Sequence, residues 1–111
     1  MTLTQDQVYE RLSTVLDPET HINIVDMGLI YDVRQVAEKS TESTPHFHIL
    51  YSLTTPACPL ASTIQMMVWD AFRDLEAEDF RPERDLTLEL TFDPPWVTDL
   101  MSEEAKAEMG F

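Results

Sequence analysis

The sequence predicts an α+β domain (an α/β two-layer arrangement) in which a small mixed three-stranded sheet carries helices mainly on one face. Segments 29–36, 46–53 and 86–92 alternate apolar side chains with the period of a strand, and segments 4–16 and 60–75 repeat them with the period of a helix. With a short final helix, the order is α-β-β-α-β-α. Strands with one apolar face need a layer of helices to bury that face. The chain has 111 residues, so we expect a single domain over residues 1–111.

The first helix carries a helix-start signal. Thr4 suits the N-cap position, and Gln7, three residues later, completes a capping box. Asp17 precedes a proline, which disfavours the α conformation and ends the helix there. The apolar face of this helix is expected to comprise Val8, Leu12, Val15 and Leu16.

A loop is expected over residues 19–28, followed by two strands joined by a polar hairpin connection over 38–45. Gly28 is one of two glycines, and we expect a positive φ or a close backbone approach there. The second strand separates its side chains cleanly between two faces. One face carries Phe47, Ile49, Tyr51 and Leu53, and the other carries His46, His48, Leu50 and Ser52.

The second half of the chain continues with a helix, a strand and a short helix. The third strand should place Leu86, Leu88, Leu90 and Phe92 on one face, and Ser102 and Gly110 suit the start and end of the last helix. If the strands around the central helix are parallel, their connection should be a right-handed crossover. The apolar stripe of the central helix is Leu60, Ile64, Met67, Val68, Ala71, Phe72 and Leu75.

Charge excludes two classes of partner. Twenty-one acidic and seven basic residues give a net charge of −14, which repels nucleic acid and anionic membrane surfaces. Solubility accounts for such a charge, and so does a basic patch on a protein partner. The sequence has no signal peptide and no membrane span, and its single cysteine fits a reducing compartment. We therefore expect a cytoplasmic protein.

The single cysteine, Cys58, lies between the second strand and the central helix. Pro59 suits the first helical position, so Cys58 would stand at or just before the N-cap. A thiol at a helix N-terminus tends toward the thiolate, which attacks electrophiles and binds soft metals. The alternative is a small buried residue that fills the strand–helix corner.

Three groups of polar residues are candidates to support Cys58. Asp17 and Glu19 flank Pro18, although from the local sequence an exposed helix-terminating turn is the favoured interpretation. Asp26 is an acid among apolar residues, which needs a partner or bonds local backbone N–H groups. Thr54 and Thr55 can bond the thiolate or cap the helix.

The histidines offer weaker candidates. His46 and His48 share a strand face and could form half a metal site, but no third ligand has a supporting spacing, so a solvated face is the favoured interpretation. His21 is the obvious candidate for a base in a cysteine-dependent enzyme. We do not expect an enzyme.

The central helix also carries Met66, Trp69 and Arg73 away from its main apolar stripe. Exposed methionine, tryptophan and arginine are typical of a protein interface, so these residues predict a homodimer or a protein partner. The alternative is that the C-terminal segment, with Trp96 and Met101, folds over them.

Four motif segments occur in the order and spacing of a known family: Asp17–Glu19 (Asp-Pro-Glu), Ile24–Tyr31 (Ile-Val-Asp-Met-Gly-Leu-Ile-Tyr), Thr54–Pro59 (Thr-Thr-Pro-Ala-Cys-Pro) and Asp93–Trp96 (Asp-Pro-Pro-Trp). On these segments the chain resembles the SufT/PaaD-like family of metal–sulfur cluster assembly proteins, from about Val8 to Gly110. The phenylacetate branch of that family carries a cysteine-rich C-terminal extension. The sequence ends at Phe111 without one, which favours the short, single-domain SufT-like branch.

The resemblance implies the small α/β domain of iron–sulfur assembly proteins and a role in cluster assembly or delivery. Cys58 matches the characteristic cysteine of the family, and Asp17, Glu19, Asp26 and Thr54 match its other signature positions. The implied partners are the iron–sulfur assembly machinery and recipient apoproteins.

The number of cysteines limits how this chain could bind a cluster. Iron–sulfur clusters typically take four cysteine ligands, and this chain supplies one. We therefore expect at most a transient iron–sulfur cluster or iron, ligated by Cys58 together with a partner, a second subunit or a small thiol. The alternative function is a non-catalytic targeting adaptor that links the assembly machinery to recipients, and the third is the cysteine-dependent enzyme.

Overall fold

The computed structural model describes residues 3–17, 20–40, 45–54, 61–78 and 80–110. Its elements follow the predicted order, with one additional short helix before the third strand. They are α1 (Gln5–Leu12), β1 (Ile30–Gln35), β2 (Phe47–Tyr51), α2 (Ala61–Asp70), α3 (Pro82–Asp85), β3 (Leu86–Leu90) and α4 (Glu103–Met109), with 3₁₀ turns at Ala37–Lys39, Arg73–Glu78 and Thr98–Leu100.

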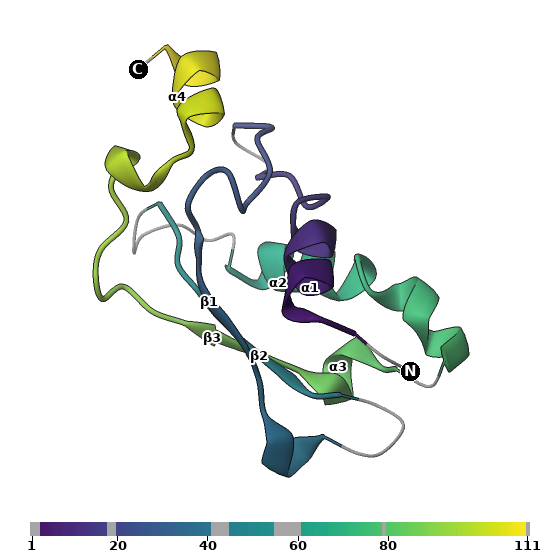
Figure 1. Cartoon of the computed structure of the whole chain (residues 1–111). Helices are drawn as coiled ribbons and strands as arrows, with labels where there is room; N and C mark the ends of the chain where they lie inside the picture. The colour runs from purple at the N-terminus through teal and green to yellow at the C-terminus, as the bar shows by residue number, and fades with distance from the viewer. Residues whose placement is uncertain (1–2, 18–19, 41–44, 55–60, 79, 111) are drawn as a thin grey trace.

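The sheet has the strand order β1-β2-β3 (Figure 1). β1 and β2 are antiparallel, as the hairpin predicts, with an irregular register between Ile30 and Asp32. β2 and β3 are parallel and pair Phe47 with Leu86 through to Tyr51 with Leu90. The mixed sheet is therefore confirmed, and β3 forms one of its margins.

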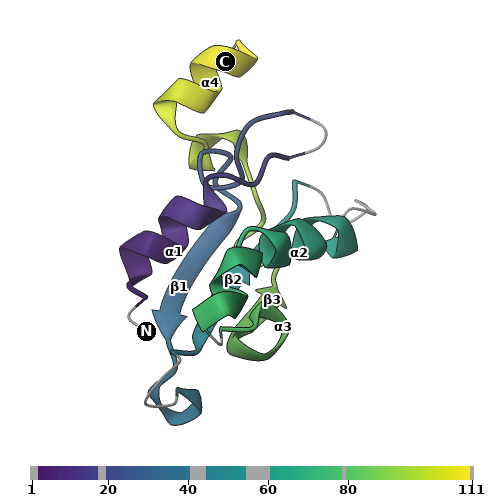
Figure 2. The ribbon, with the colours of Figure 1, turned by 90° about the vertical axis from the view of Figure 1, so that its right-hand side faces the viewer.

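Helices α1 and α2 lie on the same face of the sheet (Figure 2), which confirms the two-layer prediction. Phe47 and Ile49 of β2 are at most 1% exposed on that face, and Tyr51 is 7% exposed. The helices bury apolar side chains against them, among which Val8, Leu12, Ile64, Val68 and Phe72 are the best covered. No helix in the described part of the chain is long and apolar enough to cross a membrane.

The start of α1 is confirmed and its end is not. Thr4 accepts a hydrogen bond from the Gln7 N–H, and the Gln7 side chain accepts from the Thr4 N–H, which completes the capping box. The helix ends at Leu12, because the hydroxyls of Ser13 and Thr14 bond back to carbonyls in the last turn.

The expected burial of Leu16 is wrong. Leu16 lies beyond the end of α1, where it pairs with Asn23 in an isolated β-bridge. Its side chain is 45% exposed. The helical spacing would place Leu16 on the buried face only if α1 continued to that residue, and the helix ends at Leu12.

β3 is shorter than predicted, and its apolar face is buried only at its first residue. Leu86 is 5% exposed, Leu88 is half-buried and Leu90 is 37% exposed. Phe92, beyond the strand, is half-buried. The alternation predicted the direction of these side chains correctly, but not how far the helical layer extends over the sheet.

Candidate functional site

The described parts of the four motif segments converge on one end of the sheet. The Ile24 N–H donates to the Val15 carbonyl (2.9 Å), which ties the second motif to the chain before Asp17. The Ser52 N–H donates to the Leu29 carbonyl (2.8 Å), which ties the same motif to the chain before Thr54. Segments far apart in sequence therefore share one small region of the fold.

Asp17 is a buried residue at this end of the sheet. It is 5% exposed, so the interpretation as an exposed turn is wrong for this residue. Its N–H donates to the Ile22 carbonyl (2.9 Å) and its carbonyl accepts from the His21 N–H (2.8 Å). The Thr20 N–H points to its carboxylate oxygen Oδ1 at 3.4 Å. These contacts close a tight loop in which His21 has a φ of 61°.

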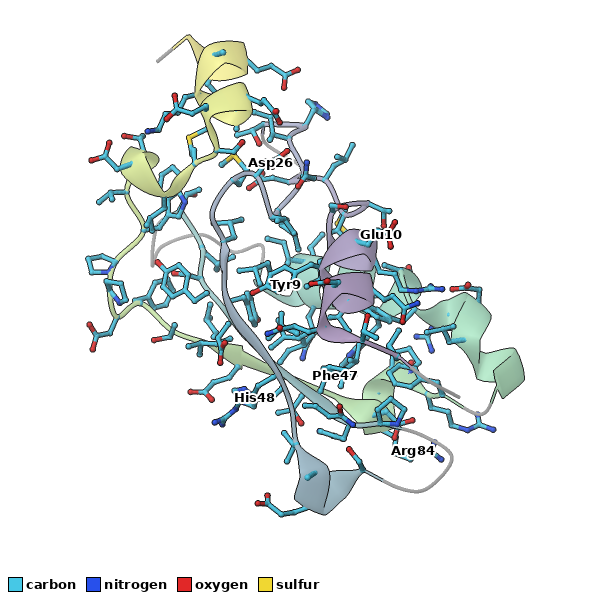
Figure 3. All side chains as sticks on the ribbon, viewed as in Figure 1. Tyr9, Glu10, Asp26, Phe47, His48 and Arg84 are labelled. Carbon is cyan, nitrogen blue, oxygen red and sulfur yellow. The ribbon has the colours of Figure 1, made fainter. Side chains whose placement is uncertain are left out.

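Asp26 lies in the loop before β1, beside the C-terminal segment (Figure 3), and is half-buried. Its Oδ2 accepts from the Asn23 amide (2.8 Å), and its N–H donates to Asn23 Oδ1 (2.9 Å). Its backbone carbonyl accepts from the Ser102 N–H (2.8 Å). Asp26 thus finds the local partner that a part-buried carboxylate requires, and Asn23 had no recognised role in the sequence.

The C-terminal segment (residues 91–110) closes over the second motif. The Trp96 Nε1–H donates to the Met27 carbonyl (2.6 Å), and the Tyr31 hydroxyl donates to the Pro94 carbonyl (2.8 Å). Gly28 has a φ of +75°, as expected, and a Cβ built there would lie 2.2 Å from the Leu100 carbonyl oxygen. The fourth motif therefore holds the second motif in place.

The remaining candidates belong to the first and third motifs. Thr54 is half-buried, just after the Ser52 contact. Cys58, Glu19 and Thr55 lie outside the described residues, so their predicted roles remain predictions.

Comparison with known proteins identifies the group to which this architecture belongs. The model of the iron-sulfur cluster assembly protein family matches residues 5–80. The chain belongs to this family.

Individual members of the iron-sulfur cluster assembly protein family match over nearly the whole chain. The Fe-S protein maturation auxiliary factor of Porphyromonas gingivalis is 36% identical over 97% of this chain and 92% of its own. The factor YitW of Bacillus subtilis, which bears the same description, is 36% identical over 96% of this chain and 93% of its own.

Two solved structures share the fold. A domain of unknown function DUF59 from Bacillus anthracis superposes with a TM-score of 0.78 at 28% identity, over 96% of this chain and 92% of the other. A conserved hypothetical protein from Thermotoga maritima gives a TM-score of 0.72 at 31% identity over the full length of both chains. The small α+β domain expected from the resemblance is therefore confirmed.

The histidine pair in this family member is not a solvated face. His46 is 6% exposed, and its Nε2 lies 2.7 Å from the Thr87 hydroxyl. His48 Nε2 lies 2.8 Å from Glu89 Oε1. Each ring thus bonds across to β3, because the parallel register places β3 side chains beside it. Within the described ranges, no group of three His, Cys, Asp or Glu side chains could hold a metal ion.

The predicted interface residues of α2 have mixed environments. Met66 is 61% exposed, and Trp69 is half-buried against the core. Arg73 is exposed and pairs with Asp70 and Glu83. The C-terminal segment leaves Met66 exposed, since Trp96 bonds to Met27 instead.

Proposed function

We propose that this protein is an accessory factor in the maturation of iron–sulfur proteins, and that Cys58 serves as a transient ligand or transfer thiol. The observation that carries the proposal is family membership: relatives described as Fe-S protein maturation auxiliary factors are aligned over nearly the whole chain. The convergence of the motif segments on one end of the sheet supports a common site for them. The reaction is then delivery of a cluster to recipient apoproteins, without turnover of a metabolite.

The cluster would be cargo and not a resident cofactor. One thiol supplies a quarter of the thiolates that a typical cluster needs. A partner protein, a second subunit or a small thiol would complete the ligand set. Glu19 is the carboxylate proposed to assist, since Asp26 already accepts a hydrogen bond from Asn23 and Asp17 is buried.

A targeting adaptor that never touches the metal is the second candidate. It is favoured by the exposed Met66 of α2, because an exposed methionine is typical of a protein interface. An adaptor and a carrier differ in one property, because only the carrier needs the Cys58 thiol for function.

Anaerobic reconstitution tests the two functions. Wild type and Cys58→Ser are mixed with ferrous iron, sulfide and a partner scaffold, and the cluster is followed by absorbance and by activation of an apo-acceptor enzyme. A carrier loses absorbance and transfer in Cys58→Ser while it keeps its melting temperature, and Glu19→Gln shows a milder loss. Thr63→Ala, an exposed change in α2, is the control and should behave as wild type.

The adaptor gives the opposite pattern. Cys58→Ser then retains both partner capture and acceptor activation in full. A lowered melting temperature, with activity loss that follows the loss of folded protein, would instead identify Cys58 as a buried structural residue.

A further inference from the structure

The outer margin of β3 is an unpaired strand edge within the described part of the chain (Figure 1). The Thr91 N–H donates to the Tyr51 carbonyl (2.9 Å), so alternate residues Thr87 and Glu89 direct their backbone groups toward β2. Leu88 and Leu90 then direct their N–H and C=O groups outward.

Two other backbone groups at the sheet margins have partners. The Leu86 N–H, at the C-cap of α3, donates to the Pro82 carbonyl. At the opposite margin of the sheet, the Gln5 side chain donates to the Val33 carbonyl of β1. On β3, the outward backbone groups of the described structure that remain for a partner are therefore those of Leu88 and Leu90.

This edge carries one charged side chain, Glu89, and lacks the other usual protection against pairing. Natural edge strands commonly carry lysine, proline or a bulge, and Leu86–Leu90 has none of these. Leu90 is 37% exposed. Leu88 is half-buried and lines a narrow apolar pocket with Ile49, Tyr51, Ile64, Gln65 and Val68. Leu88 and Gln65 are both half-buried, and the free space that they help to line is small, about 10 Å³.

Charge favours a basic partner at this edge. Glu89 projects from β3 with its side chain 58% exposed, and Asp93 is exposed just beyond the strand. A second copy would bring the same acids against them, together with another net charge of −14. Like charges placed opposite each other in a sheet are destabilising, whereas opposite charges stabilise the pair.

We propose that the β3 edge binds an extended segment of a partner protein that adds as a fourth strand. The segment carries aliphatic side chains at alternate positions, one of them small enough to enter the pocket beside Leu88, and lysine or arginine next to Glu89 and Asp93. Main-chain hydrogen bonds to Leu88 and Leu90 supply affinity, and the pocket and the acids supply selectivity. This surface does not require Cys58 or a cluster.

Phage display tests this surface: random dodecapeptides are selected for binding to the full chain. The enriched peptides are then synthesised, and their affinity for the protein is measured. The decisive variant is Leu90→Pro, which removes one outward N–H and leaves the bonds to β2 in place. Leu90→Ala is the matched control, because it removes the same side chain and keeps the N–H. We expect alternating aliphatic–basic peptides to be enriched, and to bind Leu90→Pro about fivefold to tenfold more weakly than Leu90→Ala. Glu89→Lys should weaken binding further at low salt.

Three results overturn the proposal: no enrichment of such peptides, equal binding to Leu90→Pro and Leu90→Ala, or a wild-type dimer that only Leu90→Pro dissociates. The last result would assign the edge to a second copy. Thermal unfolding of each variant accompanies the binding measurements. If Leu90→Pro does not fold, Leu88→Pro replaces it, because it removes the other outward N–H, and Leu88→Ala is then the matched control. Equal peptide binding to these two variants likewise argues against main-chain recognition.

Discussion

At the residue scale, Gly28 is the position where a single methyl group has the clearest consequence. Its φ of +75° disfavours any side chain, and the Leu100 carbonyl oxygen occupies the space that a Cβ would need. We predict that Gly28→Ala lowers the free energy of unfolding by roughly 2–4 kcal/mol, measured by urea titration.

Gly110 provides the matched control for this prediction. It has a similar φ of +84°, but no atom lies within 4 Å of the position that an added methyl group would take. Gly110→Ala should therefore cost only about 1 kcal/mol, the conformational penalty alone. Equal losses in the two variants would show that the contact with Leu100 contributes nothing.

The folded structure favours the ionised form of Asp85. Burial opposes its charge, but Arg84 donates to both carboxylate oxygens (3.0 and 2.8 Å) and the Arg81 N–H donates to Oδ2 (2.9 Å). These donors lower the pKa of Asp85 below its ordinary 3.8. The stabilisation is therefore present above pH 3.8 and is lost as the pH falls through the lower, folded-state value.

Asp85→Asn tests this linkage. At pH 7 the variant should be less stable than wild type by about 1–3 kcal/mol, and the difference should shrink toward pH 3 as the wild-type carboxylate becomes protonated. Urea titrations across this range measure the difference. Thr63→Ala, an uncharged change at an exposed position of α2, is the control, and its stability relative to wild type should not vary with pH. A difference that stays constant with pH would contradict the role of the Asp85 charge.

At the element scale, hydrogen bonds from the C-terminal segment stabilise the second motif. Trp96→Phe keeps an aromatic ring but removes the Nε1–H bond to the Met27 carbonyl. We expect a loss of about 1–2 kcal/mol and faster amide hydrogen exchange over Asp26–Leu29, with β1 and β2 unchanged. Val97→Ala, at a residue that is 51% exposed, is the control. Unchanged amide exchange in this loop would mean that the Trp96 hydrogen bond does not stabilise it.

At the scale of the whole molecule, charge opposes self-association and the exposed α2 face favours it. We propose that a homodimer forms through Met66, which is 61% exposed, with Trp69 and Arg73 at its edge. Because each copy carries a net charge of −14, the dimer should be stronger at high ionic strength, where repulsion is screened.

Sedimentation at low and high salt checks the dimer. Met66→Glu should remain monomeric at both salt concentrations with an unchanged melting temperature, since the side chain is exposed. Ala107→Glu adds the same charge on an exposed position of α4 and should dimerise as wild type does. Monomeric wild type under all conditions would reject the dimer.

The local features of this protein follow from short stretches of its sequence. The capping box at Thr4 and Gln7, the alternation along β2, and the limits of α4 at Ser102 and Gly110 all appear as predicted. The reason is that caps and side-chain periods depend on residues within one or two turns of each other. The family was likewise recognisable, because its motifs are short and lie in a fixed order.

Which of these segments meet depends on long-range packing, which no local pattern reveals. Trp96 and Met27 are 69 residues apart, and nothing in either segment specifies the other as its hydrogen-bond partner. The burial of Asp17 and His46 and the exposure of Leu16 and Leu90 also depend on where distant elements end. Local patterns fix the direction of a side chain, whereas its burial is fixed by the layer that packs over it.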